Sequence, residues 1–202
     1  MPATAMIQLD RVSKAYNGLL VLNRLSLTVN PGEVVGLVGP SGAGKTTLLH
    51  LIAGLIQPDE GHVHVASSRL SYVFQEPRLL PWRSAAANVA AALRANGADR
   101  ASARMLAQEW LQRVGLAAFA GYYPAQLSGG MQQRVALARA FAVQPDILLL
   151  DEPFSHLDDG YKQELLACLR ALIQATGVTV VYVTHALPEL DGLANHILHL
   201  QP

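Results

Sequence analysis

The chain has 202 residues, enough for one folded domain with a sizeable hydrophobic core but too few for two full independent domains. Hydrophobic residues make up 51% and charged residues 15%, a balance that excludes a largely disordered chain. Because 15 Lys and Arg are matched by 15 Asp and Glu, the charge leaves no general footprint for nucleic acid, and no nucleic-acid partner is expected.

The N-terminal part of the chain is predicted to form strands with one helix among them. Apolar residues at helical spacing predict a helix over residues 44–56, which must stop before Pro58. Runs of β-branched and alternating apolar residues predict the strands. These strands cover residues 7–12, 19–29, 33–38, 62–66 and 70–74.

An Ala-rich segment over residues 83–114 predicts two helices, with a break at Gly97-Ala98-Asp99, and irregular chain follows as far as Pro124. Strands and helices then alternate again, which predicts an α/β core with a mainly parallel sheet. The helices are predicted at residues 130–143 and 161–175, and the strands at residues 147–151, 178–184 and 196–200.

The sequence contains no membrane-spanning or secretory pattern. Its longest apolar runs are well short of the ~20 residues that a helix needs to cross a bilayer. The first ten residues lack a basic segment followed by an apolar core, so a cytoplasmic location is expected. The one cysteine, Cys168, lies in an apolar helical pattern and is interpreted as core filling rather than as a reactive thiol.

Residues 39–46 match the phosphate-loop pattern, Gly followed by four residues and then Gly-Lys-Thr, between a predicted strand and a predicted helix. Glycines let the backbone wrap around phosphate oxygens, so that amide hydrogens and a helix N-terminus face the negative charge. Lys45 is predicted to reach the β- and γ-phosphates of ATP, and Thr46 to offer its hydroxyl to Mg²⁺. The predicted nucleotide contacts here are Gly39, Pro40, Ser41, Gly42, Ala43, Gly44, Lys45, Thr46 and Thr47.

Two carboxylates, Asp151 and Glu152, follow the apolar strand at residues 147–150. Ligands of open α/β sheets bind at the carboxyl ends of the strands, so Asp151 is predicted to hold Mg²⁺ or its waters. Side chains alternate along a strand, so Glu152 points elsewhere and is the candidate general base for the attacking water. The alternative is a pair of acids that cap a strand at a solvated loop.

Residues 127–134, Leu-Ser-Gly-Gly-Met-Gln-Gln-Arg, resemble the signature motif of ATP-binding cassette (ABC) ATPases. The other family motifs follow in order over nearly the whole chain. Tyr16 resembles the aromatic that stacks on adenine, Gln75 the Q-loop glutamine, Ser155-His156-Leu157-Asp158 the D-loop and His185 the switch histidine. Taken alone, Tyr16 and His185 are more often strand-end residues of no special role, and their place in the set of motifs favours the functional interpretation.

The resemblance implies a P-loop NTPase of the ABC ATPase fold, with a mainly parallel sheet core, an N-terminal antiparallel β subdomain and an inserted helical subdomain. The single domain, residues 1–202, would divide into a nucleotide-binding core, about residues 1–75 and 146–202, and a helical insert, about residues 76–145. Lys45, Gln75, Glu152 and His185 would be catalytic, and Thr46, Gln75 and Asp151 would hold Mg²⁺.

The same resemblance implies a head-to-tail homodimer, in which Ser128, Gly129 and Gly130 of one copy close over ATP held by the other. Their helix N-terminus is a second place able to receive phosphate. Three residues or features depart from the family: Ala186 follows the histidine, His156 lies in the D-loop, and the sequence ends at Pro202, so that no C-terminal regulatory domain is expected.

Residues 75–83, Gln-Glu-Pro-Arg-Leu-Leu-Pro-Trp-Arg, resemble the Q-loop region of ATPase subunits from nitrate, sulfonate and taurine importers. We therefore expect an ATP-hydrolysing importer subunit at the inner face of the cell membrane, with permease subunits and a substrate-binding protein as partners. Trp82 either docks on a permease or packs under the helical insert. An exporter cassette and a soluble ABC ATPase remain alternatives, and the sequence does not identify the transported molecule.

Overall fold

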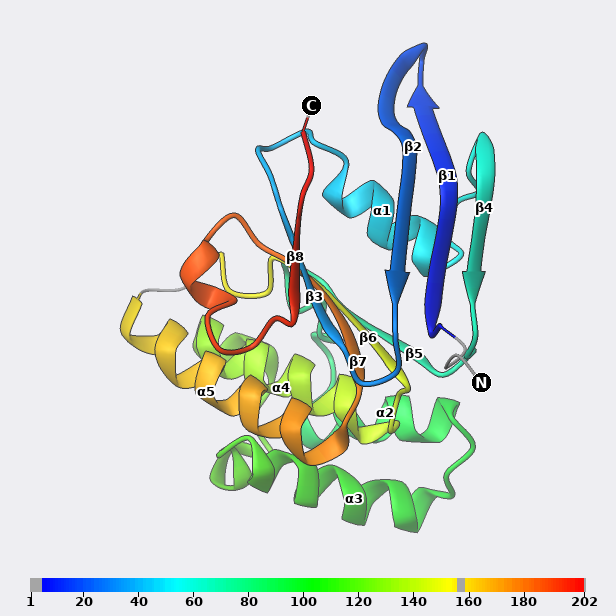
Figure 1. Ribbon diagram of the computed structural model, residues 1–202. Coiled ribbons are helices and arrows are strands. Elements are labelled where there is room, and N and C mark those ends of the chain that lie inside the picture. The colour runs from blue at the N-terminus through cyan, green and yellow to red at the C-terminus, as the bar shows by residue number, and fades with distance from the viewer. Residues whose placement is uncertain (1–4, 156–158, 202) are drawn as a thin grey trace. The chain divides into compact units, whose positions relative to one another are not determined.

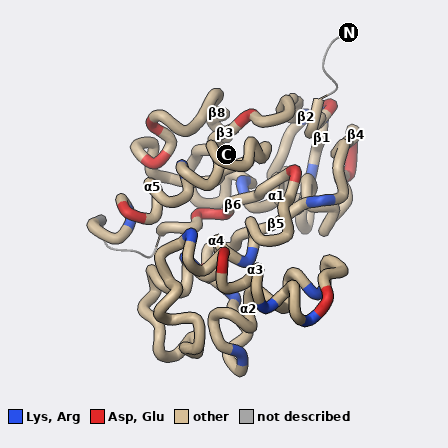
Figure 2. The backbone as a smooth tube through the Cα atoms, turned by 90° about the horizontal axis from the view of Figure 1, so that it is seen from below, with Lys and Arg blue, Asp and Glu red and all other residues tan. Residues whose placement is uncertain are grey.

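Two groups of internal contacts organise the chain in the computed structural model, which describes residues 5–155 and 159–201 (Figure 1). The first unit takes in the described residues up to Tyr72, then Asp146–Glu152 and the chain from Gly177 onward. The second unit takes in Val73–Pro145 and the described part of Pro153–Thr176. The division into a nucleotide-binding core and a helical insert, with the boundaries given above, stays a prediction. In Figure 2, basic and acidic positions are interspersed along the chain.

An antiparallel sheet and a mainly parallel sheet make up the strands, as the ABC fold implied. The antiparallel sheet has the order β2-β1-β4 and the five-stranded sheet the order β5-β6-β7-β3-β8. In the second sheet β3 pairs in parallel with β7 and β8, and β6 pairs in parallel with β7. The strands are β1 Ile7–Tyr16, β2 Leu19–Val29, β3 Val34–Val38, β4 Glu60–Val65, β5 Leu70–Val73, β6 Ile147–Asp151, β7 Thr179–Val183 and β8 His196–His199.

Helix α1, Lys45–Ile52, joins the two sheets of the first unit (Figure 1). Its buried leucines share one hydrophobic cluster with Ile7 of β1 and with Leu37 of β3. Five consecutive residues are buried in each of β3, β6 and β7, which explains why these strands read as unbroken apolar runs. The predicted continuation of the helix to residue 56 was wrong, because Gly54 adopts φ 69° and ends the helix in a left-handed turn.

Four helices form the second unit, and α2, α3 and α4 contact one another while α5 packs against α4. Ser84 and Asp99 cap the starts of α2 and α3, so the predicted break between two Ala-rich helices is confirmed. Trp110 and Phe141 stack inside this bundle, 6.1 Å between ring centroids. The helices are α2 Ala85–Ala95, α3 Arg100–Arg113, α4 Gly129–Ala142 and α5 Asp159–Thr176.

Short 3₁₀ turns connect several of these elements. They are η1 Ala117–Phe119, η2 Pro124–Gln126 and η3 Leu187–Glu189. Among the described residues, no helix has the length and apolar character to cross a membrane.

Candidate nucleotide site and signature helix

Two glycines in the loop between β3 and α1, Gly39 and Gly44, lie where a side chain has no room. Gly44 has φ 85°, and a Cβ there would lie 2.9 Å from the side chains of Val21 and Leu22 in β2. At Gly39 a Cβ would lie 2.5 Å from the carbonyl oxygen of Leu200. The loop therefore packs closely against β2 on one side and Leu200 on the other, and the N-terminus of α1 directly follows it.

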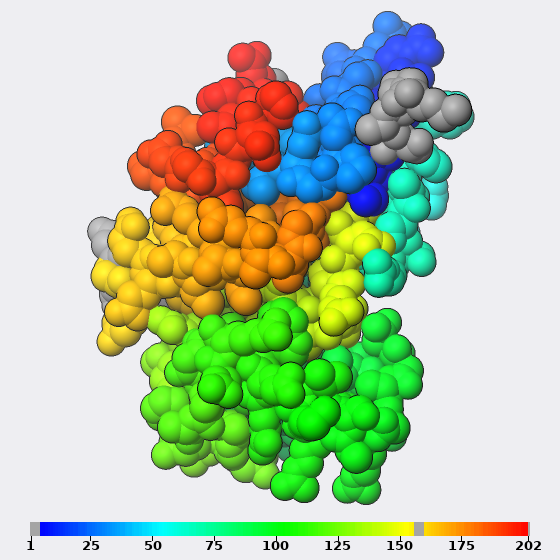
Figure 3. All heavy atoms as spheres, turned by 60° about the horizontal axis from the view of Figure 1, so that its bottom comes forward, coloured from blue at the N-terminus to red at the C-terminus, as the bar shows by residue number. Residues whose placement is uncertain are grey.

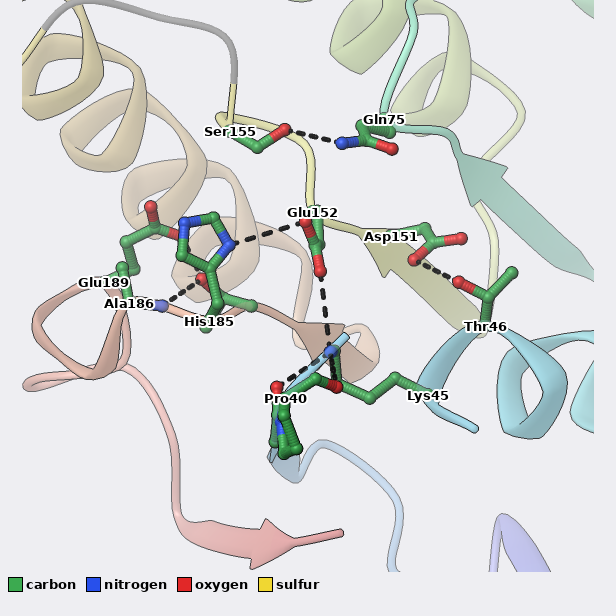
Figure 4. Close-up of polar contacts among 12 residues, drawn as sticks. Pro40, Lys45, Thr46, Gln75, Asp151, Glu152, Ser155, His185, Ala186 and Glu189 are labelled. Carbon is green, nitrogen blue, oxygen red and sulfur yellow. Dashed lines mark hydrogen bonds and ion pairs between the residues drawn. The ribbon is translucent and has the colours of Figure 1, made fainter. Parts of the chain in front are cut away.

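Lys45 lies at the centre of this loop and is 7% exposed. Its Nζ donates hydrogen bonds to the carbonyl oxygens of Gly39, at 2.8 Å, and of Pro40, at 3.0 Å. The same Nζ lies 3.7 Å from Oε1 of Glu152 (Figure 4). Two backbone carbonyl oxygens and one carboxylate oxygen therefore lie around this buried positive charge.

Asp151 is the last residue of β6 and is nearly buried. Its Oδ1 accepts a hydrogen bond from the hydroxyl of Thr46 at 3.2 Å, and its Oδ2 accepts one from the hydroxyl of Tyr72 at 2.9 Å. The hydroxyl and the carboxylate are hard oxygen donors of the kind that Mg²⁺ prefers, so this pair fits the predicted metal ligands.

Glu152 occupies an unusual backbone position immediately after β6. Its φ is 45°, a conformation that is rare for non-glycine residues. Where such residues occur, they are often part of a functional site. Its backbone N–H donates to the carbonyl oxygen of Val183 at 3.0 Å, which ties it to the end of β7. Its side chain lies between two cations or potential cations, Lys45 on one side and Nδ1 of His185, 3.4 Å from Oε2, on the other.

His185 follows β7, and its side chain is 58% exposed. The backbone before it is fixed, because the N–H of Thr184 donates to the carbonyl oxygen of Leu37 in β3 at 3.1 Å. The carboxyl ends of β3, β6 and β7 thus bring together Lys45, Asp151, Glu152 and His185, which are far apart in the sequence (Figure 4).

Tyr16 ends β1 and is 44% exposed, with Nζ of Lys14 5.7 Å from its ring centroid. It pairs with Leu19 across the hairpin, and the same hairpin presents Val21 and Leu22 to Gly44. The aromatic ring therefore belongs to the hairpin that packs against the phosphate loop. Its predicted stacking on adenine stays a prediction.

The signature segment lies in the second unit. The hydroxyl of Ser128 accepts a hydrogen bond from the N–H of Met131 at 3.3 Å, so this serine caps α4, and both Ser128 and Gly129 are exposed. A Cβ on Gly130 would meet only ordinary contacts, 3.8 Å or more from Leu165 and Tyr161. Nothing in the described packing of the chain requires glycine at that position.

The Q-loop residue Gln75 also lies in the second unit and is exposed. Its Nε2 donates a hydrogen bond to the hydroxyl of Ser155 at 3.1 Å. The catalytic and metal-binding roles predicted for Gln75 stay predictions. Of the predicted D-loop, Ser155 is described, whereas His156, Leu157 and Asp158 lie outside the described residues.

Residues 22–155 match the sequence profile of the ABC transporter family. The chain belongs to this family. Among its relatives are the Fe(3+) ions import ATP-binding protein of Agrobacterium fabrum, 43% identical over 94% of this chain, and the sulfate/thiosulfate import ATP-binding protein of Vibrio cholerae, 43% identical over 95%. The taurine import ATP-binding protein of Yersinia pestis is 40% identical over 98% of the chain.

The match covers different shares of these ABC relatives. It spans 56% of the iron protein, 55% of the sulfate protein and 80% of the taurine protein. Membership confirms the resemblance inferred from the signature motif and implies that the chain binds ATP. A taurine relative was expected from residues 75–83, and the iron and sulfate proteins widen the group.

Two groups of residues around these ABC motifs were not found from the sequence. Tyr72, which bonds Asp151, lies in a predicted strand and gave no signal of its own.

Asn88 is buried in α2, where its side chain bonds the backbone of Leu80, Arg83 and Ser84. Arg139 donates to the carbonyl oxygens of Pro77 and Arg78, both at 2.8 Å, and burial lowers the pKa of its guanidinium. The one sequence feature that could have indicated these contacts is the polar Asn88 in an otherwise Ala-rich helix.

Proposed function

We propose that the chain is the ATP-hydrolysing subunit of an ABC importer, and that two copies bind ATP head to tail. The observation that carries this proposal is the cluster at the carboxyl ends of β3, β6 and β7. There the buried lysine of the phosphate loop lies close to two carboxylates and a histidine. Each of the relatives named above is an import ATP-binding protein, which favours uptake over export.

In this proposal the protein groups divide the work of phosphoryl transfer. Lys45 exchanges its bonds to Gly39 and Pro40 for phosphate oxygens and stabilises the charge that develops on the γ-phosphate. Glu152 orients the attacking water and accepts its proton. His185, within reach of Glu152, contacts the γ-phosphate or holds that water in line.

Thr46 and Asp151 are the residues of this group that would hold Mg²⁺, with Gln75 as the further predicted ligand. The ion would supply positive charge to the phosphate oxygens during transfer. Tyr72 keeps the Asp151 carboxylate oriented through its hydroxyl.

The dimer is supported by the signature helix. Gly130 is a poor helix former, and the described packing leaves space at its Cα, so close approach from outside the chain explains the glycine. The exposed N-terminus of α4, with Ser128 as its cap, is suited to the γ-phosphate of ATP bound by the other copy. ATP then joins the two copies, and hydrolysis releases them.

A variant that binds ATP but cannot hydrolyse it tests the shared site. Glu152→Gln should lower hydrolysis by about 100-fold or more and should give a dimer on gel filtration with Mg-ATP but not without it. The matched control is Lys45→Ala combined with Glu152→Gln, which should stay monomeric because the phosphate loop loses its cation. A Glu152→Gln protein that remains a monomer at saturating Mg-ATP would contradict the head-to-tail arrangement.

Docking on a permease is supported by the segment after Gln75. Trp82 is 70% exposed, so the alternative of packing under the helical insert is not favoured. Asn88 and Arg139 hold the backbone on both sides of Leu79 by hydrogen bonds. An exposed aromatic on a fixed backbone loses little freedom on binding and is typical of an interface anchor.

A groove of about 630 Å³ runs beside this segment, along α2 and α3, the surface drawn in green in Figure 3. Several alanines and four arginines are among the residues that line it. This composition favours a permease segment with acidic side chains. The four arginines are Arg83, Arg94, Arg100 and Arg104.

The partner is tested by purifying the tagged chain from detergent-solubilised membranes and identifying what accompanies it. Trp82→Ala should reduce the recovered permease several-fold, because the aromatic anchor is lost. Leu55→Ala, which removes a comparably exposed apolar side chain (61%), is the control and should leave recovery unchanged. Recovery of an export protein, or of no membrane protein with either variant or the unmodified chain, would contradict the importer proposal. The transported solute, which we propose is of the nitrate, sulfonate or taurine type, would be identified from the accompanying substrate-binding protein.

A further inference from the structure

Behind His185 lies a buried carboxyl group that the proposed chemistry does not use. Glu189 ends the short turn η3 and is 3% exposed. Its Oε2 accepts hydrogen bonds from the hydroxyls of Tyr182 and Thr184, each at 2.7 Å. Tyr182 lies in β7 and Thr184 directly follows that strand, so the two side chains, two positions apart in extended chain, face the same side and one oxygen can bond both.

The bonds continue from Glu189 to the residue after the histidine. The hydroxyl of Thr184 donates to Glu189 and accepts from the N–H of Ala186 at 3.0 Å. The N–H of Glu189 in turn donates to the carbonyl oxygen of Ala186, also at 3.0 Å. Hydrogen bonds therefore join Thr184, Ala186 and Glu189 in a closed cycle, and His185 lies in the chain between the first two of them.

Packing fixes the same turn on the sheet. Leu190 is buried, and its side chain occupies the space over Gly36 in β3, where an added Cβ would lie 2.4 Å from the leucine Cδ1. Gly36 pairs with Tyr182 across β3 and β7, so Leu190 and Glu189 attach the turn at neighbouring points. The His185 side chain itself is largely exposed, and its direction depends on the backbone that carries it.

We propose that Glu189 is a positioning residue for His185. Through Thr184 and Ala186, Glu189 holds the backbone of residues 184–189 so that the imidazole of His185 meets Glu152. This inference rests on the proposed ATPase function. Without the carboxyl group, Thr184 and Tyr182 lose a shared acceptor in a buried place, and the backbone at Ala186 loses its fixed partner. A displacement of about 1 Å at His185 is enough to lower the rate of phosphoryl transfer substantially.

The experiment measures ATP turnover and thermal unfolding of the full chain for Glu189→Met, Glu189→Gln and Tyr182→Phe. Glu189→Met should lower kcat about tenfold or more with KM for ATP changed less than about twofold, because the loop moves but the phosphate site does not. Glu189→Gln should recover most of the rate, since the amide oxygen accepts the same two hydroxyls. Tyr182→Phe leaves the Thr184–Ala186 connection in place and should retain kcat.

A second readout follows the imidazole directly. The chain has 7 histidines, and the nitrogen-correlated NMR signal of His185 is identified as the one that disappears in His185→Ala. That signal should move in Glu189→Met and stay near its normal position in Glu189→Gln and Tyr182→Phe. If Glu189→Met fails to fold, Thr184→Val against Thr184→Ser makes the same comparison, because only serine keeps the hydroxyl.

Failure of the inference and failure of the proposed function give different results. An unmodified chain without ATPase activity would contradict the proposed function, while the NMR comparison would still test the position of His185. If the unmodified chain is active and His185→Ala is not, but Glu189→Met has normal kcat and an unmoved His185 signal, Glu189 serves only the packing of the turn and the inference is wrong.

Discussion

The phosphate loop and the signature helix both present a helix N-terminus, but their surroundings differ. Around Lys45, the functional groups contact one another: the lysine meets Glu152, Glu152 meets His185 and Thr46 meets Asp151. At the signature, the Ser128 hydroxyl accepts a hydrogen bond from its own helix in the described part of the chain, and an added Cβ on Gly130 would meet only ordinary contacts. We therefore propose that the residues around Lys45 bind a phosphate by themselves, and that the signature helix acts on a phosphate held by the other copy.

The largest expected effect comes from removing the central charge of the first region. Lys45→Ala should lower ATP hydrolysis by about 100-fold or more, because no other cation in the described loop replaces the ammonium. Turnover assays measure the loss of hydrolysis, and binding of a fluorescent ATP analogue measures any loss of nucleotide affinity. Lys162→Ala in α5 is the control for loss of a lysine, and normal turnover of Lys45→Ala would separate the phosphate loop from the activity.

The sequence could predict those parts of the site that are continuous in the chain. The loop at residues 39–46, the acids after residues 147–150 and the signature each carry their pattern within a few positions. The break between α2 and α3 was likewise local, because Gly97 and Asp99 favour it. The resemblance to the ABC family supplied the antiparallel sheet, which strand patterns alone did not.

Contacts that depend on strand order could not be predicted. Tyr72 reaches Asp151 because β5 and β6 are neighbours in the sheet, although 79 positions separate the two residues. Arg139 reaches Pro77 and Arg78 because α4 packs beside that segment. No periodicity of the sequence indicates which distant element a buried polar side chain will meet, so these residues become visible only in three dimensions.

A pair of substitutions at Ser128 sharpens the contrast between the two regions. Ser128→Asp keeps a good helix cap but adds negative charge where phosphate is proposed to bind, so turnover should fall by about 100-fold with little change in stability. Ser128→Ala removes the cap, which costs about 1 kcal/mol of stability, with a smaller loss of turnover. Thermal unfolding and ATPase assays of both variants decide the matter. Equal turnover of Ser128→Asp and the unmodified chain would leave the signature without a role in hydrolysis.

A smaller effect is expected from the partner of Asp151. Tyr72→Phe removes the hydroxyl that bonds Oδ2 and leaves the carboxylate with Thr46, so half-maximal activity should require about tenfold more Mg²⁺. The assay is ATP turnover against Mg²⁺ concentration. Tyr122→Phe, whose ring packs on Phe119 in the second unit, is the control and should not alter that curve. An identical Mg²⁺ dependence in Tyr72→Phe would show that Asp151 needs no such support.

The smallest effect lies at the opposite end of β6. Hydrogen bonds from Arg69 and then Ser67 lower the pKa of Asp146, which immediately precedes that strand. A carboxyl with a lowered pKa in the folded chain stabilises the fold above its unfolded pKa, near 4, and loses that contribution as pH falls through the folded value. Arg69→Ala should therefore lower the urea midpoint slightly at pH 7, and the difference from the unmodified chain should shrink below about pH 4. Because Asp146 and Asp151 are at opposite ends of one strand, turnover at pH 7 should not change. A loss of turnover with Arg69→Ala would contradict this expectation. It would mean that the position of Asp151, at one end of β6, depends on the contacts of Asp146 at the other end.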